Sequence, residues 1–270
     1  MKETCVESPE ELVGTQVHAW QFVAGTLAWY NTLSCISNNP PSPIPSDWLC
    51  DGLGYLSQAR IMGCEDWAIS KIREITVLRK WKDSMQATRA FSIREFALRA
   101  AEIEDSVENR IKTAAATVNA AASCEDQFAI SCVHEYGSKH TSLLITRIFA
   151  HAALAYLFAV VSGANPNLPE IQNSVGRTMA VIRDLHRLKF FCNLSWPLCV
   201  AGCLSVGGNE EEFKHIMEKY NSVPHHFGSS QHVSRIVQKC WELRKNEDHT
   251  TTDVDWTSAM QALNLDILLV

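Results

Sequence analysis

The sequence predicts an all-α fold, a single domain built as an irregular multi-helix bundle. Apolar residues recur at steps of three and four along most of the chain, and alternating strand patterns are nearly absent. No segment repeats at the period of a solenoid. With 270 residues, 46% hydrophobic and 20% charged, the chain can bury a substantial core. No Pro-, Ser- or Gly-rich linker divides it, so we expect an N-terminal tail (1–16) followed by one domain (17–270).

The first helix is predicted between Val17 and Ile36. Its apolar residues share one face, and they are Trp20, Val23, Leu27, Tyr30 and Leu33. The proline-rich run that begins at Asn38 ends this helix, because proline lacks the backbone donor and forces the preceding residue out of helical geometry.

Two longer helices are predicted next. Asp66 is expected to cap the first, which runs to Trp81 with apolar residues at helical spacing. Ser92 and Glu95 have the spacing of a capping box, which predicts the start of a helix there. The helical pattern of apolar residues weakens near Ala122.

Six helices are predicted in the remaining half, five of them with definite bounds. The expected ranges are Ser142–Val161, Pro169–Leu188, Asn193–Val206, Ser230–Arg244 and Asp255–Leu265. Gly163 suits the left-handed position after a helix end. Glu210, Glu211 and Glu212 place negative charge in the first turn of one more helix.

The stretch Leu143–Val161 is apolar enough to suggest a membrane span. It contains Arg147 and His151, however, and an arginine near the middle of a bilayer costs several kcal/mol. We therefore expect a buried helix and no membrane association. The N-terminus lacks the pattern of a secretory signal.

Charge and cysteine spacing argue against several classes of site. The net charge of −6 does not favour a sequence-independent grip on phosphates, so direct nucleic-acid binding is not expected. The ten cysteines include no C-x-x-C pair, which disfavours a zinc site, and they are interpreted as reduced, mostly buried thiols. No metal or cofactor is predicted.

The sequence contains no motif typical of an enzyme active site, such as a nucleophile elbow or a phosphate loop. His134-Glu135 and His225-His226 are the histidine groupings that could serve acid–base chemistry, but they have no evident partner. The acidic runs starting at Glu102 and Asp253 are interpreted as solvated helix faces or caps. No catalytic residue is predicted.

His151 and the tryptophans allow a binding role. His151 lies on an apolar helix, where a buried hydrogen-bonded role is the default and polar recognition in a pocket is the alternative. Seven of the eight tryptophans fall on predicted apolar helix faces, which favours core packing over the lining of a pocket.

Several stretches resemble, in order, the fungal-specific transcription factor domain, the regulatory region that follows a zinc binuclear cluster. The most specific is the Trp-Pro helix that ends in Ala-Gly-Cys, Asn193–Cys203. The other stretches are Gln21–Ser37, Met62–Lys82, His151–Leu157, Trp241 and Asp255-Trp256. The zinc cluster of this family, with its two C-x-x-C pairs, has no counterpart in these 270 residues.

The resemblance implies a transcription-regulator-like protein that acts through partners, such as zinc-cluster transcription factors, in control of a fungal secondary-metabolite gene cluster. A nuclear location is expected, with the cytoplasm as the alternative, and a homodimer is one allowed arrangement. A second hypothesis is an enzyme or binding protein of secondary metabolism, for example with a cyclase-like role, that reuses the scaffold. A third is a truncated gene product without activity.

The family includes yeast sterol-sensing regulators whose helical regulatory regions bind a lipid. By analogy, the resemblance implies a small lipophilic ligand between the helices of this chain. His151 and Trp196 are the residues predicted to lie near it.

Overall fold

The structure, a computed structural model, describes residues 63–122, 139–185, 194–221, 230–246 and 254–267, together with Leu269 and some residues between 23 and 34. Within these ranges there are no strands, and the all-α prediction is confirmed. The helices are α4 (Asp66–Ala87), α5 (Ile93–Ala122), α6 (Lys139–Ser162), α7 (Pro169–Asp184), α8 (Ser195–Cys203), α9 (Gly208–Asn221), α10 (Ser230–Asn246) and α11 (Trp256–Ala262). The predicted tail, 1–16, lies outside the described residues.

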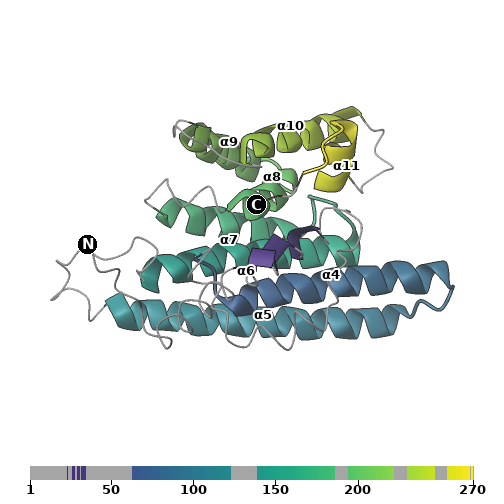
Figure 1. The fold of residues 1–270 in the computed structure, drawn as a ribbon, viewed down its shortest axis with the longest axis horizontal. Coiled ribbons are helices and arrows are strands. Elements are labelled where there is room, and N and C mark those ends of the chain that lie inside the picture. The colour runs from purple at the N-terminus through teal and green to yellow at the C-terminus, as the bar shows by residue number, and fades with distance from the viewer. Residues whose placement is uncertain are drawn as a thin grey trace, which may run out of the picture.

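The helices form two groups (Figure 1). The long helices α4, α5, α6 and α7 run along the long axis of the molecule, and the shorter helices α8 to α11 pack against one side of this group. Helix α6 contacts α4, α5, α7 and α8, so it connects the two groups.

Helix α6 is buried because helices of both groups pack against it. Its apolar side chains from Ile145 to Leu157 are almost fully inaccessible to solvent. The segment His140–Ser162 is long and apolar enough to cross a membrane, with a mean hydropathy of 1.9 in its most apolar window, but 78% of that window is buried inside the protein. The prediction of a buried helix is confirmed.

Helix α8 lies at the centre of the second group, and all nine of its residues are buried. Small side chains allow its neighbours to come close. A Cβ atom on Gly202 would lie 2.5 Å from the Phe213 ring of α9 and 2.8 Å from Val237 of α10. The glycine of the Ala-Gly-Cys end is therefore required by packing.

Several helix ends and one helix face differ from the sequence prediction. Glu65 occupies the N-cap of α4, and Asp66 is its first residue, so the prediction of Asp66 as cap was wrong. The helix also continues to Ala87, past Trp81. Helix α7 ends at Asp184, with Leu185 as its C-cap, before the predicted end at Leu188.

The N-terminal helical segment is described in part, and its predicted apolar face is not uniformly buried. Leu33 is buried, but Val23, Leu27 and Tyr30 have exposed fractions of 54%, 45% and 40%. Trp29, one of the seven tryptophans predicted to lie on apolar helix faces, is buried and packs edge-on against Phe149 of α6 at 5.4 Å.

Candidate functional site

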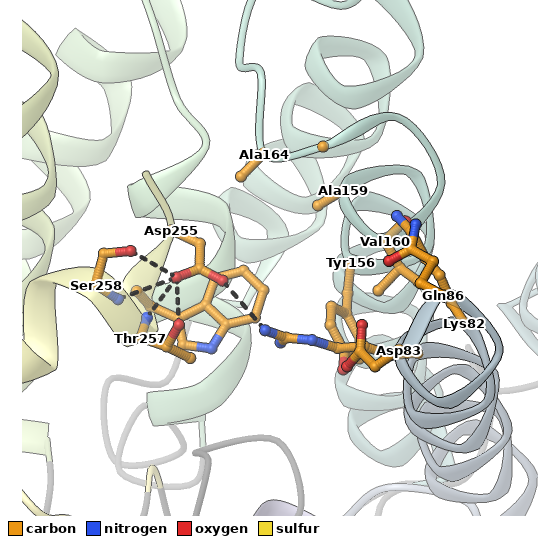
Figure 2. A pocket seen from close by; sticks show the side chains of 13 residues that line it. Lys82, Asp83, Gln86, Tyr156, Ala159, Val160, Ala164, Asp255, Thr257 and Ser258 are labelled. Carbon is orange, nitrogen blue, oxygen red and sulfur yellow. Dashed lines mark hydrogen bonds and ion pairs between the residues drawn. The ribbon is translucent and has the colours of Figure 1, made fainter. Parts of the chain in front are cut away.

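A cavity of about 410 Å³ lies where the C-terminal parts of α4 and α6 face the start of α11. Figure 2 shows Lys82, Asp83 and Gln86 of α4 on one side and Asp255, Thr257 and Ser258 on the other. Arg79, Tyr156, Gly163 and Trp256 also line it, together with small apolar residues of α6. The cavity thus joins elements that are far apart in sequence.

Asp255 forms the α11 wall of the cavity and is the N-cap of that helix. Its Oδ1 accepts hydrogen bonds from the backbone N–H groups of Thr257 (2.9 Å) and Ser258 (3.1 Å) and from both hydroxyls. This is the usual role of an aspartate before a helix, because it satisfies N–H groups that have no partner in the first turn. The other oxygen, Oδ2, lies 3.9 Å from the Arg79 guanidinium.

Lys82 binds the C-terminal end of α6. Its ammonium donates a 2.7 Å hydrogen bond to the Val160 carbonyl and lies 5.3 Å from the centre of the Phe96 ring. A cation at a helix C-terminus is favoured by the helix dipole. The helix then stops at Gly163, whose φ of 83° lies in the left-handed region that glycine adopts without strain, as predicted.

Tyr156 of α6 lines the cavity. Its ring is buried and packs edge-on against Trp256 at 5.5 Å. The hydroxyl lies close to Arg79 and Thr76, but no hydrogen bond of regular geometry satisfies it. Burial raises the pKa of Tyr156 despite the nearby Arg79 guanidinium, so the phenol is neutral at physiological pH.

Arg244 of α10 contacts the segment that leads into α11, which forms one wall of the cavity. Its guanidinium donates hydrogen bonds to the carbonyl of Cys203 and, at 2.6 Å, to that of Val254. Cys240 lies beside the same two carbonyls. Burial raises the pKa of Cys203, and hydrogen bonding to Cys203 together with burial raises that of Cys240, so both remain protonated thiols.

Four cysteines lie within the described residues, and all four are free and buried, as predicted. They are Cys64, Cys199, Cys203 and Cys240. Among the residues with a described placement, no group of three or more His, Cys, Asp or Glu side chains could hold a metal ion. The histidine pairs His134-Glu135 and His225-His226 lie outside the described residues.

His151 lies on the side of α6 that faces charged residues of α5 and α7, away from the cavity. Burial, with the Arg177 and Arg147 guanidiniums adding to it, lowers its pKa to about 3 against the opposing effect of Glu108. Glu108 and Arg177 form a two-bond ion pair (2.5 and 3.1 Å), which lowers the pKa of Glu108. The Nδ1 atom of His151 has no hydrogen-bond partner.

Trp196 of α8 packs against a different side of α6. Its ring is stacked on Phe149 at 6.0 Å and lies edge-on to Tyr156 at 6.3 Å. The structure therefore does not bring His151 and Trp196 together, and neither lines the cavity. Ligand binding at either residue stays a prediction.

Sequence reasoning did not find the cavity. The acidic run that includes Asp255 was interpreted as a solvated helix face or a cap, and Arg79 was not singled out. No local pattern indicates that these two side chains meet, because 176 positions separate them (255 minus 79) and the contact depends on how α4 and α11 pack.

A second, smaller groove of about 230 Å³ lies between α9 and α10. Phe213 and Met217 of α9 and Val237 and Trp241 of α10 form its apolar part. Lys214 lies 5.2 Å from the centre of the Trp241 ring, at the rim.

Comparison with known proteins gives a family match over nearly the whole chain. The profile of the fungal specific transcription factor domain matches residues 14–270. A trichothecene biosynthesis transcription regulator of Trichoderma arundinaceum is 33% identical over 85% of this chain and 49% of its own length. Its namesake from Fusarium sporotrichioides is 29% identical over 93% of this chain and 54% of its own length.

A third relative, the ustiloxin B cluster transcription factor of Aspergillus flavus, is 33% identical over 78% of this chain and 35% of its own length. The chain thus spans about half the length, or less, of these curated relatives. No solved structure gives a significant match.

Proposed function

Because the chain belongs to the fungal-specific transcription factor domain family, we propose that it supplies the regulatory domain of a transcription regulator that controls a secondary-metabolite gene cluster. The observation that carries this proposal is the family match over residues 14–270, together with relatives whose names describe regulators of trichothecene biosynthesis and of the ustiloxin B cluster. The domain at 17–270 would work in the nucleus.

Protein partners are part of the proposal. The net charge of −6 opposes attachment of these residues to DNA by themselves, so target recognition would come from a zinc-cluster factor bound to the domain. The groove between α9 and α10 offers apolar side chains with a charged rim, which is the composition of many protein contact sites.

Deletion of the gene, followed by transcript and metabolite profiling, tests the proposal. Transcripts of neighbouring biosynthetic genes are expected to change, and reintroduction of the wild-type gene is expected to restore them. A fluorescent fusion should accumulate in nuclei. Unchanged transcripts with accumulation of one pathway intermediate would contradict the proposal and favour the enzyme hypothesis.

A further inference from the structure

We propose that the cavity between α4, α6 and α11 binds a small organic acid, a carboxylate carried on a compact aromatic or aliphatic body, and that Arg79 is the group that recognises it. This goes beyond the predicted lipophilic ligand in both place and chemistry. The polar groups of the cavity differ in whether they already have partners.

Four charged side chains line the cavity, those of Arg79, Lys82, Asp83 and Asp255, and two of them are already occupied. Lys82 is bound to the Val160 carbonyl at 2.7 Å and packs on the Phe96 ring. Oδ1 of Asp255 accepts four hydrogen bonds from the first turn of α11. Neither group can turn toward a ligand without giving up a contact that completes a helix end.

Arg79 differs, because its hydrogen-bonding capacity exceeds what surrounds it. A guanidinium carries five N–H donors. Its ion-pair partner, Asp255, is 3.9 Å away, whereas charge-assisted hydrogen bonds between such groups are about 2.7–2.9 Å long. The neighbouring Tyr156 hydroxyl can engage no more than part of the remaining donors, and Asp83 contributes a second nearby negative charge. The side chain is 29% exposed, so it is accessible from the cavity while most of it is desolvated.

A carboxylate matches this arrangement because its two oxygens fit the planar guanidinium fork, and a partly desolvated cation interacts more strongly with it than a fully exposed one. The body of the ligand would lie against Tyr156, Trp256 and the small side chains Ala159 and Ala164. The volume of about 410 Å³ falls within the range of small-molecule sites, roughly 300–1,000 Å³.

Such a ligand would touch α4, α6 and α11 together. Asp255, the N-cap of α11, is joined to Arg79 only by a 3.9 Å ion pair, so a ligand that binds Arg79 and packs on Trp256 would add a second connection between the two helix groups. The use of this binding as a regulatory signal rests on the proposed function, but the binding itself does not.

The purified chain should be titrated with benzoate by calorimetry and by tryptophan fluorescence, with the uncharged isostere benzamide as ligand control. Benzoate is expected to bind and to raise the melting temperature, and benzamide is not. Arg79→Gln should weaken benzoate binding about tenfold or more, the scale of a lost charge-assisted pair. Lys80→Gln removes an exposed charge from the same helix outside the cavity and should bind as the wild type does.

Arg79→Lys provides a second variant if Arg79→Gln does not fold, because it keeps the charge but loses the fork, and weaker benzoate binding is expected there too. Equal binding of benzamide, undiminished binding in the Arg79 variants, or no binding at millimolar benzoate would overturn the proposal. Binding of inorganic phosphate in place of benzoate would also overturn it. These results are separable from the transcript profile of the deletion strain, which tests the regulatory role alone.

Discussion

His151 shows how burial and neighbouring charge act together on one side chain. Its imidazole is 2% exposed, and the arginines at 147 and 177 penalise a positive charge there. The folded protein therefore keeps His151 in its neutral form. A histidine in an apolar helix could be assigned to the interior from sequence. The two arginines that add to the effect of burial on its pKa come from its own helix and from α7, and only packing brings the second one near.

Acid is expected to destabilise the protein through this residue. An unfolded histidine has a pKa near 6.5 and the folded one about 3, so below pH 6.5 the unfolded state gains a proton that the folded state does not. The stability present above pH 6.5 is lost as the pH falls toward 3, by about 2 kcal/mol at pH 5. The lowered pKa of Glu108 acts in the same direction at lower pH.

Urea unfolding at pH 7 and pH 5 measures this effect. His151→Leu should lose less stability between the two pH values than the wild type, by about 2 kcal/mol. His140→Gln, at an exposed position of the same helix, should keep the wild-type dependence. An unchanged pH dependence in His151→Leu would show that the histidine is not the titrating group.

Gly202 is required by close approach, since a methyl group there would overlap the Phe213 ring and Val237. Gly202→Ala is expected to cost about 1–3 kcal/mol of folding free energy, the usual range for overpacking a core. Gly176→Ala is the matched control, because its Cβ would come no closer than 3.6 Å to Asn209, and alanine is the better helix former. Chemical denaturation of both variants decides the matter, and a neutral Gly202→Ala would contradict it.

At the scale of elements, α11 is a helix whose stability comes from its contacts. It has seven residues, too few to be stable alone in water. The Asp255 cap and the Arg244 hydrogen bonds to the carbonyls of Cys203 and Val254 hold it against α8 and α10. These contacts also fix the α11 wall of the cavity.

Replacing Arg244 with methionine should loosen this wall while keeping much of the side-chain volume. The variant leaves two carbonyls without their charged donor, which is expected to cost on the order of 2 kcal/mol. Hydrogen exchange should rise in α11 and change little in α4. Arg235→Gln, an exposed change on the same helix, should leave exchange as it is. A uniform rise across all helices would instead indicate global destabilisation.

The sequence predicted helices more reliably than it predicted their faces and ends. Long stripes such as that of α4 identify a helix because burial of one side imposes the 3.6-residue period. The period does not say which neighbour covers the stripe, which is why Val23 and Leu27 are exposed although they lie in register with buried Leu33. The cap of α4 was missed because Glu65 is the N-cap by backbone conformation alone; its side chain makes no capping hydrogen bond and accepts one from the Trp67 indole instead.

At the scale of the whole molecule, the fold class and the family were predictable, and the cavity was not. Apolar periodicity is local, and the Trp-Pro to Ala-Gly-Cys helix is a contiguous motif whose every residue is buried. The cavity has lining residues from three helices and depends on their relative placement. The location of Arg79 opposite Asp255 is therefore a property of tertiary packing alone.

The charge of the whole chain leads to the last prediction, that these 270 residues do not bind duplex DNA tightly at physiological salt. Tight non-specific contact requires several lysines and arginines on phosphates, and here 30 acidic residues outnumber 24 basic ones. Among described residues, arginines such as Arg177 and Arg99 are further committed to ion pairs with glutamates.

Fluorescence anisotropy with labelled duplexes from promoters of the neighbouring genes, at 50 and 150 mM salt, measures this. Weak binding that vanishes between the two salt concentrations is the expected result, because few counterions are released. Addition of a zinc-cluster factor that binds the domain should retain the chain on the same duplex. Tight, sequence-dependent binding by the chain alone would contradict the proposal that this domain has a regulatory role and that a partner protein recognises the DNA.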